Sequence, residues 1–225
     1  MDNNPSISVI VPAHNAVKYL AEAIQSVICQ NYTPLEIIVV DDGSTDGTAG
    51  VIASFGNKVR YIFQENSGPA VARNTALEMA NGDIIGFIDA DDIWTKEKIT
   101  TQLPVLLEHP EIDIVLGAFQ WVRQTTFSKA DEPFENLFDP QISYSFGASL
   151  IRKNVFDKIG RLDPAMWYSE DIDWFLRARD YGISIWRQHE IVLFYRLHEN
   201  NISRHRSVSN SYFIKALKHS IDRRR

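Results

Sequence analysis

Three carboxylates stand within four positions, at Asp89, Asp91 and Asp92, directly after the apolar run 84–88. Carboxylates this close repel one another unless a cation or solvent compensates their charge. Mg²⁺ and Mn²⁺ take oxygen ligands and commonly bridge one or two carboxylates to substrate phosphates. The run therefore predicts a divalent-cation site. The alternative is that Asp92 caps the following helix and the other two carboxylates are solvated.

A second acidic pair, Asp41 and Asp42, ends another apolar run within the segment 39–48, VVDDGSTDGT. A carboxylate in such a turn can accept a hydrogen bond from the N–H of a nucleobase, whereas Asp46 could serve only as a helix cap. The glycines fit neither G-x-G-x-x-G nor G-x-x-x-x-G-K-[ST]. Dinucleotide-dependent redox chemistry and P-loop hydrolysis are therefore disfavoured.

Two later segments carry further candidate groups. Glu170 and Asp171 open a helical pattern in the segment 169–174, SEDIDW. Carboxylates in a first turn favour the positive end of the helix dipole, so capping alone is one interpretation, and a general base beside a metal site is the other. His198 lies in the segment 195–203, YRLHENNIS. It could be a metal ligand, or a structural or exposed histidine.

The elements that must position these groups follow from periodicity. Over the first ninety residues, short β-branched runs alternate with longer segments of helical period, which predicts a parallel sheet with crossover helices. The expected strands are 7–12, 36–41, 59–63 and 83–89, and the expected helices are 17–30, 46–55 and one starting at Pro69. In open parallel sheets ligands bind beyond the carboxyl ends of the strands, where both aspartate groups would lie.

The second half of the sequence has a less regular hydrophobic pattern. Its expected elements are a helix from 95 to about 109, a strand 113–120, a strand 144–151, a short helix 152–159, a helix 169–181 and one or two strands in 183–196. The segment 123–141 is polar and aperiodic, so we expect a long surface loop that could act as a lid.

Composition is that of a single globular domain. The chain has 225 residues, 44% of them hydrophobic and 23% charged, enough to bury a sizeable core. Cys29 is the only cysteine and lies in an apolar helical pattern, so we expect a buried thiol and a reducing compartment. The sequence shows neither the pattern of a signal peptide at the start nor an apolar run long enough for a membrane span, so a soluble protein is expected.

Charge is unevenly distributed. The formal total is −6, but residues 204–225 hold seven basic side chains and one acidic, which leaves about +6 there and −12 on the rest. Apolar residues recur in this tail at helical spacing, at Val208, Tyr212, Ala216, Leu217 and Ile221. An amphipathic helix of this kind could sit on an anionic membrane surface, or pack on the body or in a homodimer contact. No nucleic-acid partner is expected.

Six segments recur together in this order: VIVPAHN at 9–15, VVDDGSTDGT at 39–48, NSGPAVARN at 66–74, DADD at 89–92, ED at 170–171 and YRLHENNIS at 195–203. Jointly they closely resemble family-2 glycosyltransferases of the GT-A fold, from Ser6 to about Ser203. The resemblance implies an α/β fold with a Rossmann-like, mostly parallel central sheet flanked by helices. Residues 1–95 would form the nucleotide-sugar-binding half, 96–205 the acceptor-side half, and 206–225 a basic amphipathic helix.

The resemblance also implies roles for individual residues. Those expected to hold the nucleotide-sugar are Pro12, Ala13, His14, Asn15, Asp42, Arg73, Asp89, Ala90 and Asp92. Asp42 would face a uracil ring, Arg73 would contact a phosphate or support the base pocket, and His14 departs from the frequent tyrosine at its place. Asp89 and Asp91 match the metal-binding D-x-D, for Mn²⁺ or Mg²⁺, with His198 as a metal or diphosphate ligand. Asp92 would support these metal ligands from behind or contact a sugar hydroxyl.

The implied activity is inverting transfer of a sugar from a nucleoside diphosphate, with UDP favoured over dTDP or GDP. Asp171 matches the catalytic base, and Glu170 would help to position the acceptor. The acceptor would be a hydroxyl of a saccharide or lipid-linked saccharide in cell-surface polysaccharide or glycolipid synthesis, in the cytoplasm or at the inner face of the membrane. The alternatives are a non-catalytic sugar-nucleotide-binding protein and a sugar nucleotidyltransferase. The latter is disfavoured because no glycine-rich basic loop follows the first strand.

Overall fold

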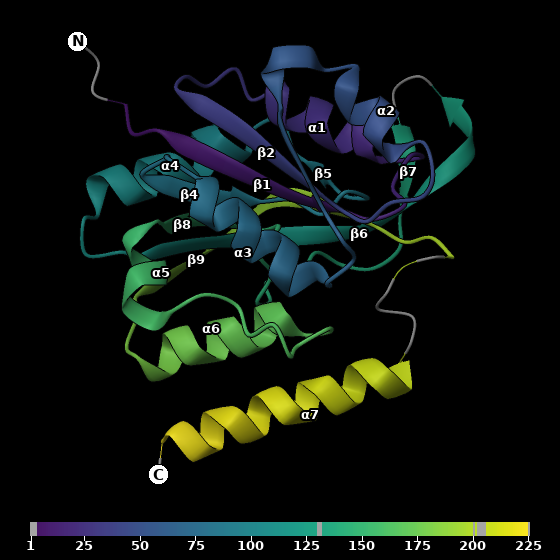
Figure 1. Ribbon diagram of the computed structural model, residues 1–225. Helices are drawn as coiled ribbons and strands as arrows, with labels where there is room; N and C mark the ends of the chain where they lie inside the picture. Colours follow the sequence, from purple (N-terminus) through teal and green to yellow (C-terminus); the bar gives the residue numbers. More distant parts are fainter. Residues whose placement is uncertain (1–3, 130–131, 200, 202–205, 225) are drawn as a thin grey trace.

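The computed structural model describes residues 4–129, 132–199, 201 and 206–224. Four strands of its first half pair in parallel in the order β3-β2-β1-β4 (Figure 1). They are β1 (Ile7–Ala13), β2 (Leu35–Asp42), β3 (Arg60–Gln64) and β4 (Ile84–Phe87). β1 sends Val9 and Val11 to one core cluster and Ile10 to the other. It is therefore buried on both faces, which is why its apolar run is nearly continuous.

The second half extends the same sheet with strands of both directions. β8 (Ser149–Arg152) lies antiparallel between β4 and β6 (Ile114–Lys129), β9 (Ile185–Arg196) is parallel to β6, and β5 (Ile93–Trp94) closes the edge. β7 (Glu132–Asn136) pairs only with β6. Within the described residues the strands thus form one mixed, nine-stranded sheet whose first half is the expected parallel one.

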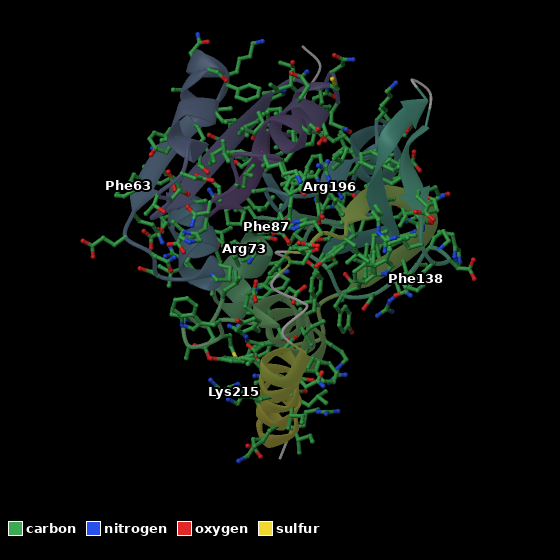
Figure 2. The ribbon with its side chains drawn as sticks, turned by 90° about the vertical axis from the view of Figure 1, so that its right-hand side faces the viewer. Phe63, Arg73, Phe87, Phe138, Arg196 and Lys215 are labelled. Carbon is green, nitrogen blue, oxygen red and sulfur yellow. The ribbon has the colours of Figure 1, made fainter. Side chains whose placement is uncertain are left out.

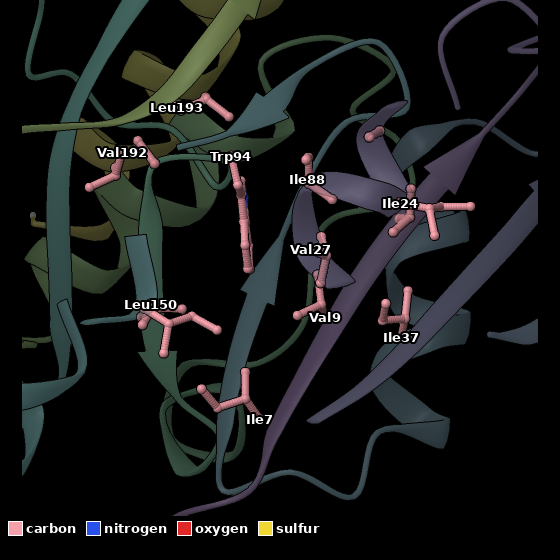
Figure 3. Packing of buried hydrophobic residues seen from close by; sticks show 14 of the residues in the cluster. Ile7, Val9, Ile24, Val27, Ile37, Ile88, Trp94, Leu150, Val192 and Leu193 are labelled. Atoms are coloured by element: carbon pink, nitrogen blue, oxygen red, sulfur yellow. The ribbon is translucent and has the colours of Figure 1, made fainter. Parts of the chain in front are cut away.

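Helices cover both faces of the sheet. α1 (Leu20–Ile28), α2 (Thr48–Ala53) and α4 (Lys98–Glu108) contribute to one core cluster, which surrounds Trp94 (Figure 3). α3 (Pro69–Met79), α5 (Asn154–Ile159) and α6 (Glu170–Asp180) contribute to the cluster on the other face. A 3₁₀ turn at Gly56–Lys58 follows α2. The architecture is three layers, helix, sheet and helix.

The terminal helix α7 (Arg206–Arg223) lies outside these layers and runs beside α6 (Figure 1). A helix is thus present where the tail was predicted to form one, but of the apolar positions in its predicted stripe only Ala216 is buried, whereas Val208, Leu217 and Ile221 are exposed. Along the described ranges of the chain, no helix has the length and apolarity that crossing a bilayer requires. Of the predicted features, Asn200, Ile202 and Ser203 of the segment 195–203, and Arg204 and Arg225 of the basic tail, lie outside the described residues.

Two expectations from the sequence are wrong in part. The segment 123–141 is not a loop throughout, because β6 continues to Lys129 and pairs antiparallel with β7. The polar, aperiodic sequence of this segment hides the strand pattern. The strand expected at 144–151 is confined to Ser149–Arg152, and β5 was not predicted because two residues carry no periodicity.

Cys29 also differs from expectation, because its side chain is exposed rather than buried. It lies one residue beyond the end of α1, outside the buried stripe formed by Leu20, Ala23, Ile24 and Val27. Its Sγ accepts a hydrogen bond from Gln25 Nε2 at 3.3 Å.

Gly82, just before β4, gives a stability prediction. A Cβ at this position would lie 2.4 Å from Ser8 N and 2.8 Å from Ile7 C, which are backbone atoms that cannot move aside without shifting β1. Gly82→Ala should lower the free energy of unfolding by about 3 kcal/mol or more, measured by chemical denaturation. Gly50→Ala in α2, where a Cβ meets nothing within 4 Å, is the matched control and should raise it by about 0.5–1 kcal/mol. Equal changes in the free energy of unfolding for the two variants would contradict the close approach of Gly82 to the backbone of β1.

Candidate active site

One cleft of about 1550 Å³ gathers the predicted site residues. It opens at the carboxyl ends of β1, β2 and β4 and reaches the first turn of α6. Its walls include Pro12, Ala13, His14, Asn15, Asp42, Arg73, Asp89, Ala90, Asp91, Glu170, Asp171 and His198. The strand ends therefore bring together residues from both halves of the chain, as expected for an open sheet whose parallel strands end at one edge.

Asp42 is held rigidly on the nucleoside side. Its Oδ1 accepts hydrogen bonds from Gln64 Nε2 at 2.7 Å and from Ser67 N at 2.9 Å, and its Oδ2 accepts one from Gly68 N at 2.9 Å. Because an ionised carboxylate offers about four acceptor sites, Oδ2 keeps one for a ligand. Asp42 can thus still receive a base N–H while being fixed by the loop that leads into α3.

His14 is tied to the same corner of the cleft. Its Nδ1 lies 2.7 Å from the carbonyl oxygen of Asp42, and because a carbonyl only accepts, Nδ1 carries the proton. Its Nε2 is then the acceptor for the side-chain amide of Asn15, at 3.1 Å. Asn66 Nδ2 lies 3.3 Å from the same atom. The imidazole is therefore oriented by three neighbours rather than free to rotate.

Arg73 joins the two sides of the cleft. Its Nη2 donates to Asp89 Oδ1 at 2.5 Å, and its Nη1 donates to Glu170 Oε1 at 2.5 Å. The guanidinium is almost fully buried, lies near the middle of the molecule in Figure 2 and has its carbon 5.9 Å from the centre of the Phe146 ring. Both ends of its planar fork are therefore occupied by carboxylates, one after β4 and one at the start of α6.

Glu170 and Asp171 are held at the first turn of α6. Ser169, in the left-handed region with φ 56°, turns the chain into that helix. Burial, opposed in part by the Arg73 charge, raises the pKa of Glu170. Burial, followed by repulsion from Glu170, raises the pKa of Asp171 to about 7. A carboxylate that titrates near neutrality is suited to accept a proton during catalysis.

Asp91 faces His198 across the cleft. The distance from Asp91 Oδ2 to His198 Nε2 is 2.9 Å. Among the described residues no three His, Cys, Asp or Glu side chains gather to hold an ion by themselves. Adjacent ligands of an octahedral ion with bonds of about 2.1 Å lie about 3 Å apart, so this pair fits two places in a Mg²⁺ or Mn²⁺ shell that substrate phosphates and water would complete. Asp89 instead points its Oδ1 at Arg73.

Asp92 is the one predicted site residue that does not line the cleft. Its carboxylate is buried and accepts a hydrogen bond from Arg196 N at 3.0 Å. Burial, then the charges of Asp91 and Asp89, raises its pKa well above the ordinary value. Asp92 is thus placed to hold β9 behind Asp91, and its contact with a donor sugar stays a prediction.

Two neighbours of Asp91 and His198 were missed by sequence reasoning. Asn201 is buried and donates from Nδ2 to Asp91 Oδ2 at 3.2 Å and to the Arg196 carbonyl at 3.0 Å, while its Oδ1 accepts from His198 N. Tyr19 packs its ring on the His198 imidazole, with centroids 4.7 Å apart. Asn201 could have been found from its place three residues after His198, but Tyr19 had no signal beyond a helical pattern.

The chain matches the model described as Glycosyl transferase family 2 over residues 8–167. TuaG of Bacillus subtilis, named a putative teichuronic acid biosynthesis glycosyltransferase, is 30% identical over 214 residues, covering 88% of this chain and 82% of TuaG. An uncharacterized glycosyltransferase of Rickettsia typhi is 31% identical over 210 residues, covering 87% of this chain. This chain spans 65% of the length of that Rickettsia relative.

Solved structures agree on the architecture. TarS of Staphylococcus aureus in complex with UDP-GlcNAc has a TM-score of 0.80 at 24% identity, covering 97% of this chain and 66% of that one. The mannosyltransferase PcManGT of Pyrobaculum calidifontis, in complex with GDP-Man and Mn²⁺, has a TM-score of 0.75 at 18% identity, covering 98% and 65%. These likenesses give the GT-A fold. Since the family match extends over more than two thirds of a chain that also has this fold, the chain belongs to glycosyl transferase family 2.

Proposed function

We propose that this glycosyltransferase moves a sugar, with inversion, from a nucleoside diphosphate to a hydroxyl group, with UDP-sugars as the favoured donors. The observation that carries the proposal is one cleft holding Asp91 beside His198 together with Asp171, whose pKa is raised to about 7. The complexes of TarS with UDP-GlcNAc and of PcManGT with GDP-Man support a nucleotide-sugar donor. The name of TuaG supports an acceptor in cell-surface polysaccharide synthesis.

In the proposed reaction Asp171 accepts the proton of the acceptor hydroxyl as its oxygen forms a bond to the anomeric carbon. The bond from that carbon to the diphosphate oxygen breaks, and the diphosphate leaves with the electron pair. Asp91 and His198 would hold a Mn²⁺ or Mg²⁺ ion, which would supply positive charge to neutralise this leaving group. Arg73 keeps Glu170 in place at the start of α6, and the free acceptor site on Asp42 would receive uracil N3–H.

The proposal also covers acceptor and location. The acceptor is a saccharide or lipid-linked saccharide used for a polysaccharide or glycolipid, in the cytoplasm or at the inner face of the membrane. The basic helix α7 is the surface through which the protein would contact that membrane, and pairing of two copies is its alternative use. Residues 1–95 supply the donor side of the cleft and 96–205 the acceptor side.

A thermal unfolding series tests the donor site. A ligand that binds only the native state, present at about 100 times its Kd, stabilises by about 2.7 kcal/mol, or roughly 5–10 °C in Tm for a chain of this size. We expect UDP with Mn²⁺ to give such a shift and UDP alone a smaller one, with dTDP, GDP and NAD measured in parallel. Asp91→Ala should lose the part of the Tm shift that depends on the metal ion.

The control for this series is Glu97→Ala, which removes an exposed carboxylate outside the cleft and should shift like the parent protein. No shift with any nucleotide and metal would contradict the proposed donor site. Multiple turnovers of UDP release in the presence of acceptor would separate an enzyme from a protein that only binds sugar nucleotides.

A further inference from the structure

The inward face of α7 is already occupied by α6 and its surroundings. Tyr212 and Ala216 pack with Met166, Ile172 and Leu176 in a small apolar cluster, and Ala216 is fully buried. Tyr212 and Ala216, two apolar residues of the predicted membrane-facing pattern, therefore pack inside the protein. Whatever α7 presents to a partner must come from its other face.

Ion pairs fix α7 in this orientation. Asp173 of α6 lies 3.4 Å from His219 Nδ1 and 3.7 Å from Arg223 Nη1. Asp180, at the other end of α6, lies 3.3 Å from Arg223 Nε and accepts a hydrogen bond from Ser220 Oγ at 2.6 Å. Both carboxylate side chains are only 3% exposed, so these contacts are shielded from solvent. Rolling the helix would break the contacts of His219, Ser220 and Arg223, whereas Asp173 would keep Arg177 and Asp180 would keep Arg179 on α6.

The outward face carries an unpartnered apolar stripe. Phe213, Ile214, Leu217 and Ile221 are 44%, 64%, 38% and 48% exposed. At about 100° per residue these four positions fall within one arc of about 100° on the helix. Single exposed apolar residues are ordinary, but four on one arc of one helix form a patch.

Basic side chains accompany this stripe. Lys218 is exposed on the same helix beside it, and Lys215 lies further round the helix. Arg224 is exposed too, but its Nε lies 3.7 Å from Asp180 Oδ1 of α6. Residues 204–225 together carry about +6, whereas the rest of the chain carries −12. An anionic surface would attract α7 and repel the remainder, and two copies paired through α7 would bring like charges together. The charge distribution therefore favours an anionic surface over a second copy of this chain as the partner of α7.

We propose that the stripe formed by Phe213, Ile214, Leu217 and Ile221 docks the protein on an anionic lipid bilayer, with Lys218 at the headgroups. The stripe inserts into the boundary between headgroups and acyl chains while the helix lies in the plane of the surface. The inward ion pairs hold the rest of the protein in one fixed orientation on the bilayer.

This orientation bears on the acceptor. Ser209, in the second turn of α7, lines the same cleft as Asp91 and Asp171. A bilayer beneath α7 therefore lies next to an edge of the cleft. If the proposed transferase function holds, on which this step rests, the surface selects lipid-linked acceptors over free saccharides.

Vesicle flotation of the full chain tests the docking surface. The probes are vesicles of phosphatidylcholine alone and of phosphatidylcholine with 30% phosphatidylglycerol, at low and high salt. We expect binding only to the anionic vesicles, weakened by salt. The double variant Ile214→Ser with Leu217→Ser should lower the partition coefficient about tenfold or more, because two aliphatic side chains no longer leave water.

The matched control is Val208→Ser, an exposed apolar residue of α7 on a different side from the stripe. It should float like the parent protein. Absence of binding to anionic vesicles, or equal loss in Val208→Ser and the double variant, would overturn the proposal, and loss of a dimer in light scattering of the double variant would assign the stripe to a second copy instead. The Tm shift with UDP and Mn²⁺ should be unchanged in all variants, so failure of docking and failure of the donor site are distinguishable.

Discussion

Asp171→Asn should lower the turnover number about 10²- to 10⁴-fold while leaving the affinity for UDP with Mn²⁺ unchanged. The amide keeps the shape of the side chain but cannot accept the proton of an attacking hydroxyl. Donor affinity is measured by calorimetry and turnover by UDP release. The matched control is Asp157→Asn, which changes an exposed carboxylate on α5 and should keep the donor affinity and turnover number of the parent protein. Equal loss of donor affinity and turnover in Asp171→Asn would contradict the division of roles.

The raised pKa of Asp171 fixes the sign of the pH dependence. Because a base must be deprotonated to act, turnover should rise with pH through about 7 and then level off. The same shift acts on stability, since a carboxyl whose folded pKa lies above its unfolded value of 3.8 destabilises the fold once it ionises in the unfolded chain. Asp171→Asn should therefore raise Tm at pH 8 and leave it unchanged near pH 3. A misfolded variant would show neither behaviour.

Arg73→Met should be the most damaging substitution in the cleft for stability. It removes the cation that faces both Asp89 and Glu170, and deleting one partner of a buried ion pair costs about 3–5 kcal/mol, or roughly 6–20 °C in Tm. Calorimetric unfolding measures the loss. The pKa of Asp171 should rise further, because the Arg73 charge holds it down, which moves the pH profile of turnover upward.

Two companion variants make this result interpretable. Adding Glu170→Gln to Arg73→Met removes an unpaired buried charge and should recover part of the lost stability. Arg73→Lys keeps the charge but lacks the planar fork that reaches two carboxylates at once, so its stability should fall between the parent and Arg73→Met. A Tm of Arg73→Met within 2 °C of the parent would contradict the bridging role.

The sequence predicts the parallel half of the fold well, for a physical reason. β1 and β2 are buried on both faces, so their runs are continuously apolar and their ends are marked by polar residues. The aspartates of the cleft follow directly from those ends. The antiparallel pairing of β6 with β7 was not foreseen, because the segment 123–141 shows no period-2 alternation of apolar and polar residues.

Contacts between residues far apart in the sequence could not be predicted either. Arg73 is separated from Glu170 by 97 positions, and Arg196 from Asp92 by 104. The proximity of Arg73 to the donor side was expected from the resemblance, but its two carboxylate partners depend on how α3 and α6 pack against the sheet. Local patterns cannot encode such packing, so the enclosure of the Asp92 side chain beside β9 was not foreseen.

The pairing of β4 with β8 and of β5 with β9 has a mechanical consequence. Both ladders cross the predicted division at residue 95, and Trp94 packs in a core that contains Leu150 and Leu193 from the far side (Figure 3). Backbone hydrogen bonds along these two ladders therefore join the donor-side and acceptor-side halves of the cleft. We expect the two halves to unfold together as one cooperative unit instead of parting as separate lobes.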